Sequence, residues 1–150
     1  MPGRLERIWL KRAHRGPMDP VETATLVEGK GVQGSASFGS YRQVTIMALE
    51  RWLAMMAELG ADVDPSARRA ELMLSGLDLE RSRDRLVNVG SCLLRIGGEV
   101  KPCERMDEAY RGLREVMGPQ WGGGAWAEVL RGGDIAVGDD VSWHGELFSE

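Results

Sequence analysis

The segment AWAEVLRGGDIAVGDDVSW, residues 125–143, decides the fold class of this chain. Its short runs of β-forming residues alternate with turns of glycine and aspartate, which is the pattern of β-hairpins. The runs lie at 125–130, 135–137 and 141–143, and similar ones occur upstream at 5–11, 21–27, 42–47, 71–74, 85–89 and 92–96. Many short strands joined by glycine-rich turns predict a mainly β protein, most simply a twisted, closed β-barrel.

Two segments instead place apolar residues three and four apart, which indicates a helix. The first is 48–60, ending at Gly60. The second is 107–118, where Asp107 is expected to cap the start and Gly118-Pro119 to stop the helix. We expect these two helices as insertions in the barrel. Shorter features are expected at 16–20, a proline-flanked turn, and at 64–67, a helical turn.

The composition is that of one folded domain, expected to span residues 1–150 with a core from about 5 to 143. Hydrophobic residues make up 43% of the chain, enough for a buried core. The net charge of −4 argues against binding to nucleic acid or an anionic membrane surface. No apolar run approaches the roughly 18–20 residues of a membrane span, and no apolar signal stretch follows Met1, so a cytoplasmic location with reduced thiols is expected.

Cys103, in the segment KPCER at 101–105, is the residue best suited to chemistry. Pro102 keeps Lys101 extended, so the cysteine is expected where a strand gives way to the second helix. Lys101 and Arg105 favour a reactive thiolate, whereas Glu104 opposes it, and a small buried hydrophobe is the alternative. Cys92, which alternates with Leu94 and Ile96, is predicted to be a core residue.

Two other sequence patterns resemble ligand-binding motifs but do not predict a binding site. Residues 29–34 match G-x-G-x-x-G, but poor helix formers follow, so no NAD site is expected. His14 and His144 lack the spacing to the cysteines that zinc sites show, so no zinc is expected either.

Two roles are open for three arginines, Arg42, Arg68 and Arg69. They form ordinary surface ion pairs, or they converge on one mouth of the barrel. In the second case their guanidinium groups would make a fork for phosphate.

Five segments carry a resemblance that extends over about residues 5–143. They are GVQG at 31–34, RQVTI at 42–46, RAELMLSGLDL at 69–79, KPCERMD at 101–107 and GGDIAVGDDV at 132–141. In this order and spacing they resemble the MOSC domain family, named for the C-terminal region of molybdenum cofactor sulfurases. The resemblance implies a β-barrel and a small stand-alone member of the family.

The same resemblance assigns the site. Cys103 matches the characteristic cysteine, which implies a catalytic residue that either ligates the metal of a molybdenum-pterin cofactor or carries sulfur as a persulfide. The implied cofactor-binding residues are Arg42, Gln43, Arg69, Ser75, Gly76, Lys101 and Arg105. The implied partners are a cysteine desulfurase or a redox partner, with a small-molecule substrate such as an N-hydroxylated compound.

Two positions depart from the family pattern. Ser35 stands where many relatives have an acidic residue, and Glu71 stands where the family usually has asparagine. A carboxylate beside a phosphate site is electrostatically unfavourable, so we expect Glu71 to oppose cofactor binding. A barrel that binds a small ligand or a protein without catalysis is the alternative function.

Overall fold

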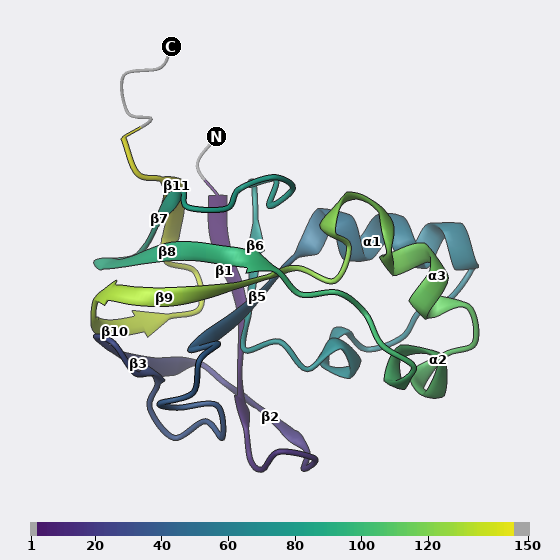
Figure 1. Cartoon of the computed structure of the whole chain (residues 1–150), viewed down its shortest axis with the longest axis horizontal. Helices are drawn as coiled ribbons and strands as arrows, with labels where there is room; N and C mark the ends of the chain where they lie inside the picture. The colour runs from purple at the N-terminus through teal and green to yellow at the C-terminus, as the bar shows by residue number, and fades with distance from the viewer. Residues whose placement is uncertain (1–2, 146–150) are drawn as a thin grey trace.

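The computed structural model describes residues 3–145 and shows a closed β-barrel with helices on one side (Figure 1). The strand order is β11 (Asp140–Trp143), β7 (Leu86–Val89), β8 (Cys92–Glu99), β9 (Ala125–Arg131), β5 (Val44–Ala48), β6 (Leu72–Ser75) and β1 (Gly3–Lys11). The barrel closes where Gly3 of β1 pairs with Val141 of β11. The β5–β6 pair is parallel and the other neighbours are antiparallel. The predicted fold class is confirmed.

A second, smaller sheet lies against one end of the barrel. It has the order β10 (Gly133–Ala136), β3 (Thr23–Val27) and β4 (Gly31–Val32). Leu26, Val32 and Ile135 of this sheet are buried in the barrel core. The sequence did not predict β4, because its two residues lie inside a glycine-rich stretch.

The predicted strand at 21–27 is confirmed over residues 23–27 as β3, whereas the predicted turn at 16–20 is wrong. The chain turns at residues 12–16, where Gly16 N donates to the carbonyl of Ala13 at 3.0 Å. It then forms β2 (Met18–Val21), which pairs with β1 and ends before β3. Pro20 is tolerated because β2 is the last strand of its sheet, where a missing N–H leaves no partner unsatisfied.

The first predicted helix is confirmed as α1 (Leu49–Leu59), and its left-handed C-cap is Gly60. The second is wrong as a single helix: it divides into α2 (Arg105–Ala109) and α3 (Leu113–Met117). Gly112 has φ 93° between them, outside the helical region. Asp107 does not cap the helix that contains it. Its Oδ1 instead accepts from the backbone N–H groups of Gly112 and Arg114, both at 3.1 Å, and so caps α3.

Two 3-10 turns complete the elements. They are η1 (Pro65–Arg68), the predicted helical turn, and η2 (Pro119–Trp121). Asp64 caps η1 by accepting from Ser66 N at 2.9 Å. Among residues 3–145, no helix combines the length and apolar character that a membrane span requires.

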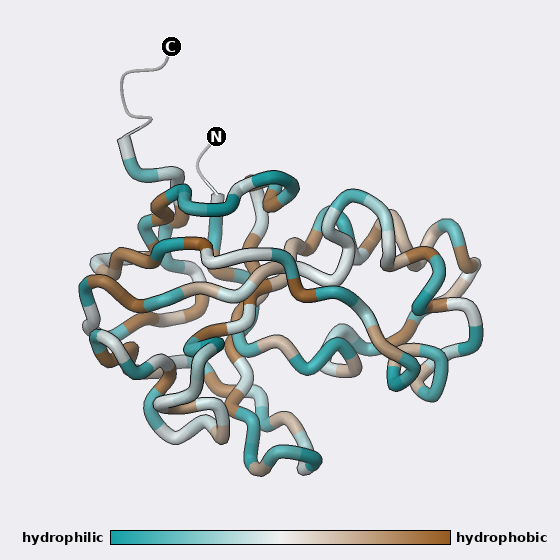
Figure 2. Tube along the Cα trace, viewed as in Figure 1, coloured by the Kyte–Doolittle hydropathy of each residue, from teal (hydrophilic) through white to brown (hydrophobic). Residues whose placement is uncertain are grey.

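Alternation along the strands gives the protein two apolar cores. Ile46 and Leu72 point into the barrel, whereas their neighbours Met47 and Met73 point outward and pack against the helices. Trp52 of α1 is buried in this second core. Figure 2 shows apolar residues along the barrel strands and more hydrophilic residues in the outer loops. The helices are thereby fixed against the barrel wall, and the segment that carries Cys103 runs between the two.

Candidate functional site

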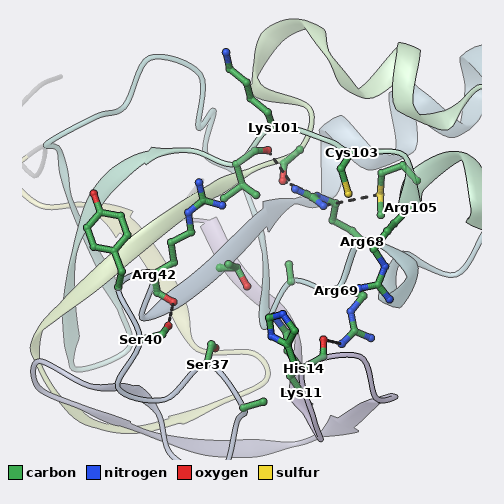
Figure 3. A pocket seen from close by; sticks show the side chains of 17 residues that line it. Lys11, His14, Ser37, Ser40, Arg42, Arg68, Arg69, Lys101, Cys103 and Arg105 are labelled. Carbon is green, nitrogen blue, oxygen red and sulfur yellow. Dashed lines mark hydrogen bonds between the residues drawn. The ribbon is translucent and has the colours of Figure 1, made fainter.

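A cavity of about 620 Å³ opens between the barrel and the segment that carries Cys103 (Figure 3). Its charged lining residues are all basic: Lys11, Arg42, Arg68, Arg69, Lys101 and Arg105, with His14 beside them. No aspartate or glutamate belongs to the lining within the described part of the chain. We call this cavity the Cys103 pocket. In a protein of net charge −4 it is a local concentration of positive charge, which suits an anionic ligand.

Cys103 lies between β8 and α2, as predicted. Its carbonyl accepts from Met106 N at 3.0 Å at the start of α2. The residue is half-buried and its thiol is free, whereas Cys92 is fully buried in the barrel core. Burial raises the pKa of the Cys92 thiol. Of the two cysteines, only Cys103 therefore lines the pocket.

Arg68 forms the inner wall behind this sulfur. Its side chain is 9% exposed, and Nε donates to the carbonyl of Gly123 at 2.8 Å and Nη2 to that of Val100 at 3.2 Å. Burial lowers the pKa of this arginine to about 10, and the neighbouring Cys103 acts in the opposite direction. Within residues 3–145 no carboxylate pairs with Arg68, so its charge is available to an anion in the pocket.

Arg69 also lines the pocket, but its guanidinium is bonded to the turn after β1. Its backbone is left-handed, with φ 65°, where it forms the C-cap of η1. The guanidinium donates to the carbonyls of Gly16 at 2.5 Å, His14 at 3.2 Å and Ala13 at 3.3 Å. Burial, and then the charge of Arg105, lower the pKa of Arg69. Arg69 thus secures the turn after β1 and still faces the pocket.

Lys11, at the end of β1, was not among the predicted site residues. Burial is the main cause that lowers the pKa of its ammonium, and Arg69, Arg68 and Arg105 lower it further. Glu71 is the charge that acts in the opposite direction. The only signal in the sequence is a lysine that ends a strand with three other charged residues, which is too common to single it out.

Five of the predicted site residues share the pocket and three do not. Cys103, Arg42, Arg69, Lys101 and Arg105 line it, and so does Arg68, so the three arginines converge on one cavity and the phosphate fork stays a prediction. The Gln43 side chain instead accepts from Val129 N at 2.9 Å. Ser75 Oγ donates to Glu6 at 2.7 Å, and Gly76 N donates to Glu50 at 2.7 Å. Gly76 lines a separate cavity near the start of α1.

Glu71 is not among the residues that line the pocket, and its predicted effect on an anion there stays a prediction. Its side chain is fully buried behind the wall and accepts hydrogen bonds from Ser35, Ser37 and Thr45.

Comparison with models of known protein families assigns the chain to a family. The model of the MOSC domain matches residues 33–142, a range that contains the Cys103 pocket segments from Ser37 onward. The chain belongs to the MOSC domain family.

Solved structures with the same architecture support this assignment at the level of the fold. The YuaD protein from Bacillus subtilis is 18% identical, with a TM-score of 0.79 and 94% of each chain covered. YiiM from Geobacillus stearothermophilus is 16% identical, with a TM-score of 0.72, covering 95% of this chain and 75% of that one. YiiM from Escherichia coli, also 16% identical, has a TM-score of 0.67, covering 95% and 68%. A comparison with curated protein sequences found no match.

Proposed function

We propose that this protein binds a molybdenum-pterin cofactor in the Cys103 pocket, with the Cys103 sulfur as a ligand of the metal. The observation that carries the proposal is one accessible thiol in a wall whose other charged groups are cations. The MOSC family is linked to the molybdenum cofactor, which gives this arrangement its most direct use.

The residues present fit such a group. Within the described residues, no cluster of three histidine, cysteine, aspartate or glutamate side chains could hold a metal ion by itself. A metal that arrives chelated by an organic cofactor needs fewer protein ligands, and a thiolate is a soft donor suited to it. The phosphate of the cofactor needs counter-charge, which Arg69, Arg105 and Lys11 supply.

Each side chain then has a definite task. Lys11, Arg69 and Arg105 bind and orient the phosphate. Arg68 holds the segment of Cys103 against the Gly123 loop and places a buried positive charge beside the sulfur. When bound, the cofactor supplies two-electron redox chemistry, for which an N-hydroxylated compound is the proposed class of substrate.

The proposed role of the basic side chains in binding the phosphate is tested by measuring how much cofactor the protein retains. Purified protein is incubated with extracted molybdenum cofactor, washed, and assayed for oxidised pterin fluorescence. Wild type retains pterin, and Arg69→Gln with Arg105→Gln loses at least about tenfold of that retention. Lys30→Gln, on an exposed turn outside the pocket, matches wild type. Failure of wild type to retain pterin, or equal retention by the double variant, contradicts the proposal.

A second function, sulfur transfer, is favoured by one observation. Cys92 is buried in the barrel core, so it has no access to a persulfide on Cys103 that it could convert to a disulfide. In the transfer, the Cys103 thiolate attacks the terminal sulfur of a donor persulfide, for example on a cysteine desulfurase. The donor S–S bond breaks, its cysteine leaves as a thiolate that takes up a proton, and a new S–S bond forms at Cys103. Mass spectrometry after incubation with the donor would find the added sulfur on Cys103 and none on Cys92. Labelling of neither cysteine contradicts it.

A further inference from the structure

The most deeply buried acidic side chain in the described structure has no part in the function proposed above. Glu71 is 0% exposed and lies directly before β6. A buried carboxylate is costly unless it is well paired, so its partners indicate what it is for.

Those partners are hydrogen-bond donors from two other segments. One carboxylate oxygen of Glu71 accepts from the hydroxyls of Ser35 and Ser37, the latter at 2.5 Å. The other accepts from the backbone N–H of Thr45 at 3.1 Å. Among residues 3–145 no arginine or lysine forms an ion pair with Glu71, so hydrogen bonds hold its charge.

Both serines belong to the loop that forms one wall of the Cys103 pocket. Ser37 lines the pocket itself, and Ser40, Tyr41 and Arg42 follow it along the same wall (Figure 3). Ser35 also accepts from the backbone N–H of Lys11 at 3.2 Å. The hydroxyl of Ser35 therefore connects Lys11, on one side of the pocket, to the carboxylate beneath it.

We propose that Glu71 is a positioning residue of the Cys103 pocket, whose carboxylate holds the loop from Ser35 to Arg42 in its binding geometry through Ser35 and Ser37. The proposal rests on the proposed function in treating this pocket as the place where an anion binds. Its first readout, the mobility of the loop in unliganded protein, is independent of any cofactor.

The contact between residues 35 and 71 allows a rescue experiment. Asp at 35 is one atom longer than Ser, and Asn at 71 is one carbon shorter than Glu. The double variant Ser35→Asp/Glu71→Asn keeps the span of the contact, the hydrogen bond and the negative charge, with the ends exchanged. Ser35→Ala removes one tether but keeps the charge, and Glu71→Gln removes the charge but keeps the shape.

Hydrogen exchange followed by mass spectrometry gives the first readout. In Ser35→Ala and Glu71→Gln, amides of residues 33–42 exchange at least about tenfold faster, because each change weakens hydrogen bonds to a charged group. The amides of β7 and β8 are unaffected, and the double variant restores slow exchange in the loop. Glu6→Gln is the matched control, because Glu6 also accepts from a serine on the barrel, Ser75, but lies outside the pocket.

Pyrophosphate, used as a simple anion, gives the second readout by slowing alkylation of Cys103 with iodoacetamide. Protection is at least about threefold weaker in the two single variants and returns in the double variant. Unchanged exchange in both single variants, equal acceleration over the whole barrel, or loosened loops with undiminished protection each overturn the proposal. If pyrophosphate protects no variant, wild type included, the anion site of the proposed function fails, and the exchange data alone decide whether Glu71 tethers the loop.

Discussion

Arg68 and Gly123 are joined by a 2.8 Å hydrogen bond from the guanidinium Nε to the carbonyl oxygen, although they are 55 positions apart. The same guanidinium donates to Val100, just before the Cys103 segment. One buried cation therefore joins η1, the glycine-rich loop before β9 and the segment that leads to Cys103. This contact sets the inner wall of the pocket, and it requires close packing of backbone.

Substitution of Gly123 by alanine tests that packing. A Cβ at this position would lie 2.1 Å from the carbonyl oxygen of Val100, so the backbone must shift. We expect the free energy of unfolding to fall by about 2 kcal/mol or more, as for an overpacked site. Gly118→Ala is the control, since its Cβ would meet only Glu115 O at 3.5 Å and we expect almost no change. Equal stability of the two variants in urea unfolding would refute the role given to Gly123.

The two cysteines should differ sharply in reactivity. Cys103 is half-buried in the pocket wall, whereas Cys92 is fully buried and has a raised pKa. In native protein at pH 8, a disulfide reagent such as DTNB should modify Cys103 rapidly and Cys92 only on global unfolding. Peptide mapping of the modified protein assigns the sites. Rapid modification of Cys92 in folded protein would show that the barrel core opens locally.

The buried ammonium of Lys11 is predicted to lower the free energy of unfolding at neutral pH, while its charge favours an anion in the pocket. Its pKa is lowered by burial and by Arg69, Arg68 and Arg105, against the opposing effect of Glu71. Between the lowered pKa of the folded state and the ordinary value of 10.5, the unfolded chain binds more protons. Stability from this group therefore rises with pH across that window.

The matching variant is Lys11→Met, which removes the cost of burying the ammonium. We expect a higher Tm at pH 7, loss of the alkaline rise in stability contributed by Lys11, and weaker protection of Cys103 by pyrophosphate. Lys30→Met, at an exposed turn, serves as the control. A lower Tm for Lys11→Met at pH 7 would run against this account.

Asp107 should stabilise α3 rather than α2. Its carboxylate accepts from the N–H groups of Gly112 and Arg114, so Asp107→Ala should cost about 1 kcal/mol, as loss of a helix cap does. Glu108→Ala, an exposed neighbour on α2, should cost less. Hydrogen exchange would place the loss of protection at residues 112–117. If protection falls at 105–109 instead, the assignment of the cap is wrong.

Asp107 also shows where sequence reasoning about the fold stops. The alternation of the strands and the apolar spacing of α1 are local patterns, and the structure confirms them. The break at Gly112 depends on a hydrogen bond that reaches five residues along the chain, and a glycine inside a helical pattern does not reveal it. The turn before β2 was misplaced for a similar reason, because the position of Pro20 on an edge strand is a property of the sheet.

At the site, the sequence predicted which residues line the pocket better than it predicted their contacts. The position of Cys103 between a strand and a helix was predicted from Pro102 and the expected helix start, and the structure confirms it. The convergence of the three arginines was one of two interpretations, and all three line the pocket. Ser35 and Glu71, 36 positions apart, were two unrelated departures in the sequence, but the structure shows that they are one hydrogen-bonded pair. Such a pairing depends on the parallel contact of β5 with β6 and the folding of the loop over it, which no local pattern encodes.

The proposed ligation of the metal by the Cys103 sulfur is tested by the molybdenum content of the purified protein. Wild type and Cys92→Ala, isolated from molybdenum-replete cells and measured by plasma mass spectrometry, should carry comparable molybdenum per chain. Cys103→Ala should remain folded by circular dichroism and carry at most about a tenth of that amount. Full molybdenum content in folded Cys103→Ala would contradict ligation by this sulfur.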